Sequence, residues 1–68
     1  MDTMDHSENE LREARRQIES IIHKLERTVI TLESKENADR CRSQITLAKR
    51  RIDAFTIAMD LIDRELEE

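Results

Sequence analysis

Apolar residues in the second half of the chain recur at steps of three and four, the spacing of one face of an α-helix. The stretch from residue 51 to residue 66 carries two such faces, on roughly opposite sides of the same predicted helix. We call the first face the seam of this helix and expect it to pack against the rest of the chain. Its residues are Ala38, Cys41, Ile45, Ala48, Ile52, Phe55, Met59, Ile62 and Leu66.

The second apolar face, which we call the back face, consists of Leu47, Ala54, Ile57, Ala58 and Leu61. A helix that is apolar on two sides needs a neighbour on each side, and a chain this short supplies only one. We therefore predict that the back face binds a partner protein or a second copy of the chain, with Ile57 and Leu61 as anchors. The alternative is that these are scattered surface residues without a binding role.

The first half of the chain predicts an amphipathic helix over residues 8–33. Ser7 and Glu10 form the S-x-x-E pattern of a capping box ahead of the apolar run. The predicted seam of this helix follows a heptad spacing, with Ile22 and Val29 widening it on one flank. Its residues are Leu11, Ala14, Ile18, Ile21, Leu25, Thr28 and Leu32.

A polar segment at residues 34–37 separates the two patterns, and the seam is displaced by one residue across it. This slip favours a turn and a second helix over residues 38–66, packed antiparallel on the first. The sequence thus predicts a single all-α domain over residues 1–68, a two-helix hairpin that completes a bundle with a second chain. One continuous helix with a register shift is the alternative, because no Gly or Pro interrupts the chain.

The charge pattern adds a second functional hypothesis. The net charge is −4, yet residues 1–10 and 60–68 are acidic, whereas the middle of the chain is basic. The basic side chains suggest an alternative function as a homodimeric four-helix bundle that binds RNA, or as a plain oligomerisation segment. The overall negative charge weighs against nucleic acid, and so does the aromatic content, because the single aromatic residue, Phe55, lies on the seam and is not available for base stacking. The basic cluster consists of Arg40, Arg42, Lys49, Arg50 and Arg51 in the first half of the second predicted helix, and of Arg12, Arg15 and Arg16 near the start of the first.

The residue types that carry chemistry are sparse. His6 and His23 lack the spacing of metal ligands, and the single cysteine, Cys41, has no histidine nearby and lies on the seam. Without glycine there is no phosphate-binding loop. We expect no enzyme activity, no cofactor and no metal. The acidic start is unlike a signal peptide and no apolar run is long enough to cross a bilayer, so we expect a cytoplasmic protein.

In its layout the chain resembles the small E-type needle co-chaperones of type III secretion. The likeness covers an acidic start, the segment LREARRQIESIIHKLERTVITL, a polar turn, and RSQITLAKRRIDAFTIAMDLIDREL. It implies a hairpin that pairs with a tetratricopeptide-like chaperone through the apolar residues of segment 52–62. Together the two would keep the needle subunit soluble and unpolymerised in the bacterial cytoplasm. Family members often have Gly or Pro in the turn, and this chain has neither.

Overall fold

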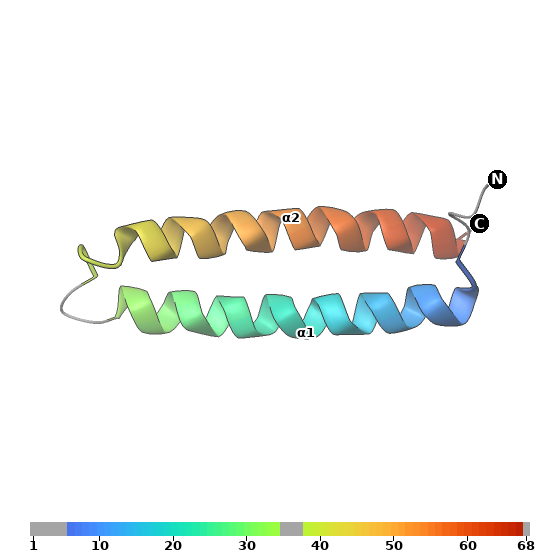
Figure 1. Ribbon diagram of the computed structural model, residues 1–68, viewed down its shortest axis with the longest axis horizontal. Helices are drawn as coiled ribbons and strands as arrows, with labels where there is room; N and C mark the ends of the chain where they lie inside the picture. The colour runs from blue at the N-terminus through green and yellow to red at the C-terminus, as the bar shows by residue number, and fades with distance from the viewer. Residues whose placement is uncertain (1–5, 35–37, 68) are drawn as a thin grey trace.

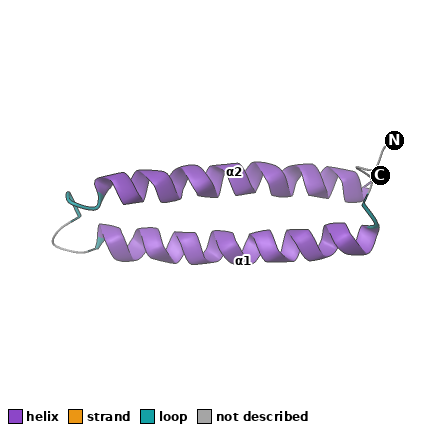
Figure 2. Cartoon of the chain, viewed as in Figure 1, coloured by secondary structure: helices purple, strands orange, loops and turns teal. Residues whose placement is uncertain are grey.

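Two antiparallel helices of equal length make up almost all of the described structure (Figure 1). The computed structural model describes residues 6–34 and 38–67, in which α1 spans Glu8–Glu33 and α2 spans Arg42–Glu67. The hairpin is 51 Å long and 20 × 15 Å in cross-section. Its open end holds the start of α1 and the end of α2, as Figure 2 also shows. The predicted helical hairpin is confirmed, and the alternative of one continuous helix is wrong.

The start of α1 is fixed by the predicted capping box. The Ser7 hydroxyl accepts a hydrogen bond from the Glu10 amide at 3.1 Å, and the Ser7 amide donates to the Glu10 carboxylate at 3.0 Å. Two of the amides that the first turn of a helix leaves unpaired are thereby satisfied. Glu8 and Glu10 also place negative charge at the positive end of the helix dipole. Sequence and structure agree on this boundary.

The connection between the helices is longer than predicted. Residues 38–41 form hydrogen-bonded turns, in which the Cys41 amide donates to the Ala38 carbonyl at 3.0 Å, and α2 begins at Arg42 rather than at residue 38. The bond between residues three apart holds this segment tighter than an α-helix, so the regular helix starts after it. Of the predicted turn at 34–37, Ser34 ends α1, and residues 35–37 lie outside the described structure.

The predicted seam of the second helix is confirmed, because each of its nine residues is buried or half-buried, seven of them in α2 and Ala38 and Cys41 in the turn before it. The predicted seam of α1 is wrong at two positions. Ile22 and Val29 are buried, whereas Ile21 and Thr28 are exposed. Packing Ile22 and Val29 against α2 buries two β-branched apolar side chains. Packing Ile21 and Thr28 there instead would bury one such side chain together with the hydroxyl of Thr28. The Thr28 hydroxyl instead donates to the Lys24 carbonyl at 3.0 Å.

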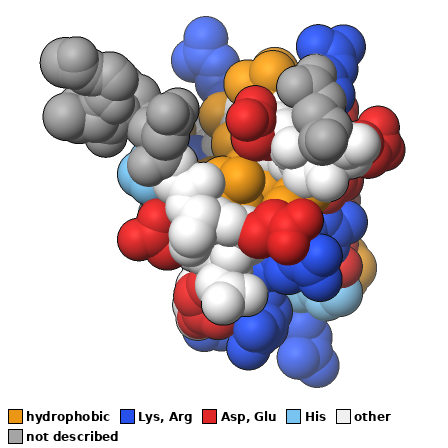
Figure 3. Space-filling model, turned by 90° about the vertical axis from the view of Figure 1, so that its right-hand side faces the viewer, with side chains coloured by type: hydrophobic (Ala, Val, Ile, Leu, Met, Phe, Trp, Pro, Cys, Tyr) orange, Lys and Arg blue, Asp and Glu red, His pale blue; other side chains and the backbone are white. Residues whose placement is uncertain are grey.

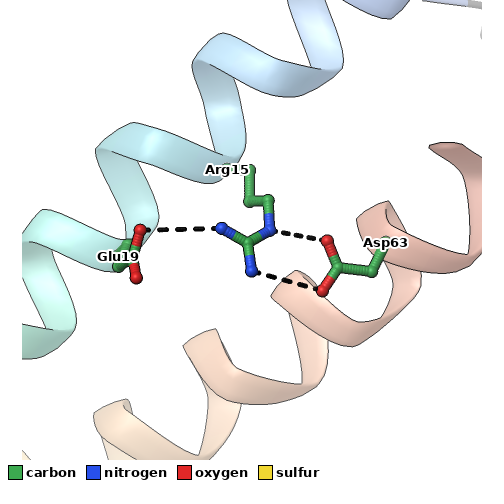
Figure 4. Close-up of polar contacts among 3 residues, drawn as sticks. All are labelled: Arg15, Glu19 and Asp63. Carbon is green, nitrogen blue, oxygen red and sulfur yellow. Dashed lines mark hydrogen bonds and ion pairs between the residues drawn. The ribbon is translucent and has the colours of Figure 1, made fainter.

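An ion pair takes the place of apolar contact near the open end. The Arg15 Nε donates to Asp63 Oδ1 at 2.6 Å and Nη2 to Oδ2 at 3.5 Å, while Glu19 lies 3.6 Å from the same guanidinium (Figure 4). The hydrogen bond and the charge of Asp63 raise the pKa of Arg15. Near the turn, Lys49 and Glu33 form a second inter-helix ion pair at 3.1 Å. Both pairs join α1 to α2 and are formed in this register.

Candidate interaction surface

The back face of α2 stays exposed after the hairpin has formed. Leu47, Ile57 and Leu61 expose 49%, 61% and 58% of their surface. Ala54 is exposed, and Ala58 is half-buried at the edge nearest α1. Because α1 covers only the seam, most of the apolar surface of these five residues faces water. Their partner-binding role stays a prediction.

The spacing of these residues places them on one side of α2, with Arg50 and Arg51 on the turn between Leu47 and Ala54. Leu47, Ala54 and Leu61 are seven residues apart and form a row along α2, and Ile57 and Ala58 lie between the last two members of that row. Figure 3, which looks onto the open end of the hairpin, shows hydrophobic side chains on the outer side of α2, at the top, with basic side chains on either side. The arrangement fits contact with another helix, which packs along such a row.

Ile21 of α1 extends this exposed apolar surface, although its spacing in the sequence predicts a place in the seam of α1. It exposes 39% of its surface and belongs to the flank of α1 opposite the one that carries Glu33 and its ion pair with Lys49. In an antiparallel helix pair, matching flanks meet, so the register places Ile21 beside Ala58. The sequence pattern did not indicate that Ile21 is exposed. The competing heptad, which passes through Ile22, contains a charged residue, Arg15, so the heptad through Ile21 looked like the better seam.

Charge divides α2 into two halves around the back face. Residues 42–51 carry four basic side chains and no acidic one, and residues 52–67 carry five acidic side chains and one basic one. Each half opposes the helix dipole, since positive charge lies at the N-terminal half and negative charge at the C-terminal half. Within α1 the charges are nearly balanced: residues 8–20 carry four acidic and three basic side chains, and residues 21–33 carry two of each. The hairpin therefore leaves the charge polarity of α2 largely uncompensated.

The residues considered for chemistry occupy separate sites. Cys41 is half-buried at the turn, His23 is exposed on α1, and His6 forms an exposed pair with Glu10 at 3.5 Å. In the described part of the chain, no three His, Cys, Asp or Glu side chains are grouped so as to hold a metal ion. Neither α1 nor α2 has the length of apolar sequence that crossing a membrane requires.

The basic side chains predicted as a nucleic-acid surface are exposed and partly paired. Arg42 lies 3.5 Å from Asp39, and Lys49 is engaged with Glu33 across the hairpin. Arg40, Arg50 and Arg51 are exposed as well. These five charges lie around the turn and in the first half of α2. The three arginines of the predicted cluster on α1 form ion pairs, namely Arg12 with Glu8, Arg15 with Asp63 and Arg16 with Glu13.

No protein-family model, curated protein or solved structure matches this chain.

Proposed function

We propose that this protein is a non-catalytic binding module, which uses the back face of α2 to cover apolar surface of a partner protein. The observation that carries the proposal is the exposure of Leu47, Ile57 and Leu61 on one side of a helix whose other side is already packed. Single exposed apolar residues are ordinary, whereas several large exposed apolar side chains on one side of a short helix indicate an interaction site. A helix of this kind binds by laying its apolar residues into a groove of the partner.

The more specific role that we propose follows the resemblance to the E-type co-chaperones. The partner is then a tetratricopeptide-like chaperone in the bacterial cytoplasm, and the pair keeps the needle subunit of a type III secretion system soluble. An α-helical repeat protein offers a concave apolar groove wide enough for one helix. The support for this role is the layout of the sequence together with the exposed face of α2.

The test is capture of the purified tetratricopeptide-like chaperone from the same genome by variants of the hairpin. The double substitution of Ile57→Glu and Leu61→Glu removes two anchors, each contributing about 2 kcal/mol when buried, so affinity should fall at least about 100-fold. Ile30→Glu is the matched control, because Ile30 is 65% exposed and lies on the outer flank of α1. Circular dichroism should show equal helix content in all three proteins.

Each result has a definite meaning. Capture by the control but not by the double variant supports the back face as the binding surface. Undiminished capture by the double variant contradicts it. If the unsubstituted hairpin captures no chaperone, the co-chaperone role is wrong. Genes for a needle subunit and a chaperone beside this one would support that role independently of the binding assay.

A further inference from the structure

We propose that in the free protein a second copy of this chain covers the back face, with the two α2 helices packed antiparallel across a two-fold axis at Ala54. The inference rests on the proposed function in one respect, since both use the back face as a docking surface. It goes further by naming the occupant of that surface before a partner protein arrives. The partner would then replace the second copy.

Symmetry of the apolar row supports a two-fold axis at Ala54. Leu47 and Leu61 lie seven residues before and seven residues after it. In an antiparallel pair with its axis at Ala54, each Leu47 meets Leu61 of the second copy, at both ends of the contact. A small residue at the centre lets the two helices approach closely, as at other tight helix crossings. The row is therefore self-complementary in shape, as a two-fold interface requires.

The charge polarity of α2 supports the antiparallel direction. All charged side chains in residues 42–51 are basic, and most of those in residues 52–67 are acidic. Antiparallel copies therefore place each basic half over an acidic half. The opposed helix dipoles add to this attraction. A parallel pair would place like charges together along the whole contact. Because, in the described structure, α1 pairs only with Lys49 and Asp63 of these charges, a second α2 is the complementary surface that the chain itself provides.

One ion pair across the interface follows from this register. Arg50 lies opposite Ala58 of the second copy, and Asp60 is the nearest acidic side chain beyond it on the flank of the contact. The pair occurs twice by symmetry. Both side chains are exposed in the hairpin and neither has an ion pair among the described residues, so each is free to make it.

The size of the contact sets the expected affinity. The 26 residues of α2 extend about 39 Å, and a helix about 10 Å wide offers a face of roughly 400 Å². That is about half of what each partner buries in an interface of standard size. We therefore expect a reversible dimer with a dissociation constant in the micromolar range, which a tighter partner can displace.

Site-directed cross-linking tests the arrangement in the full chain. In a Cys41→Ser background, Leu47→Cys and Leu61→Cys are made as two separate proteins and treated with a short bismaleimide. A mixture of the two should cross-link, whereas Leu47→Cys alone should not, because its two copies would lie about 21 Å apart along the axis. Cross-linking of Leu47→Cys to itself would show a parallel pair and overturn the proposal. Absence of cross-linking in every sample, with a monomeric mass in sedimentation, would overturn it as well.

Charge reversal tests the pairing independently. Arg50→Glu or Asp60→Arg should each raise the dimer dissociation constant roughly 2- to 30-fold, since two exposed ion pairs are lost. The doubly reversed chain should recover the original value, and Arg27→Glu on α1 is the control that should change nothing. Failure of the double reversal to restore dimerisation contradicts the antiparallel register.

The outcomes also separate this inference from the proposed function. A monomeric hairpin that loses chaperone capture with the double substitution of Ile57 and Leu61 overturns the self-pair and leaves the binding module intact. A dimer that cross-links as expected while the same double variant still captures the chaperone overturns the back face as the partner site and supports the self-pair.

Discussion

The neighbouring residues Ile21 and Ile22 allow an experimental test of which face of α1 packs against α2. They are the same residue type on the same helix, yet Ile22 exposes 7% of its surface and Ile21 exposes 39%. Substituting either with alanine removes three carbon atoms and changes helix propensity by the same amount. The difference between Ile22→Ala and Ile21→Ala therefore reports how much more Ile22 packs against α2.

The magnitude follows from the buried fractions. Three carbons at about 0.8 kcal/mol each give about 2.4 kcal/mol for complete burial, and about 0.5 kcal/mol returns through the better helix propensity of alanine. After scaling by burial, Ile22→Ala should lower the free energy of unfolding by about 2 kcal/mol, and more if a cavity remains. Ile21→Ala should lower it by at most about 1 kcal/mol, because its own helix provides part of its cover.

Urea denaturation followed by circular dichroism measures both values, at a protein concentration low enough to keep the chain monomeric. If Ile22→Ala leaves too little folded protein, Ile22→Val should still cost about 1 kcal/mol. Equal losses from the two alanine variants, or a larger loss from Ile21→Ala, would refute the packing described above and return the seam to the Ile21 side.

Two further predictions use matched positions. Ser7→Ala removes the capping box and should lower the free energy of unfolding by about 1 kcal/mol, whereas Ser20→Ala on the exposed side of α1 should not destabilise the hairpin; thermal denaturation compares them. Ala48→Leu inserts a large side chain where the helices approach and should cost about 1–3 kcal/mol. Ala54→Leu, on the back face, should leave the stability of the monomer nearly unchanged, and equal losses at the two alanines would contradict the assigned faces.

The sequence predicted the helices and the α2 seam well, because their signals are long and periodic. The bounds of α1 follow from a capping box at one end and a loss of apolar spacing at the other. Nine residues between positions 38 and 66 follow the spacing of the second seam, so a single ambiguous position does not change the prediction. The hairpin follows from the one-residue displacement of the seam across a polar segment. In one continuous helix, this displacement would interrupt the apolar face.

The seam of α1 was harder to predict because a charged residue occupies it. Steps of four and three from Leu11 pass through Arg15, Ile18 and Ile22. Because an arginine is unusual at a core position, the sequence favours the other spacing, which passes through Ala14 and Ile21. Only the structure shows that the Arg15 guanidinium reaches Asp63 on the other helix. A contact between residues that distant in sequence leaves no periodic signal, so the correct register could not be read from α1 alone.

The two helices differ in what stabilises them. Local interactions favour α1, which has a capping box, acidic residues in its first turn and one apolar face that α2 covers. For α2 the local terms are unfavourable: its first turn has no acidic residue, both halves oppose its dipole, and a second apolar face meets water. A helix with weak local terms depends on packing, and α1 supplies only one side of it. A molecule on the back face that carries the opposite charge polarity would therefore stabilise α2 more than α1, which is the physical reason for placing the binding surface there.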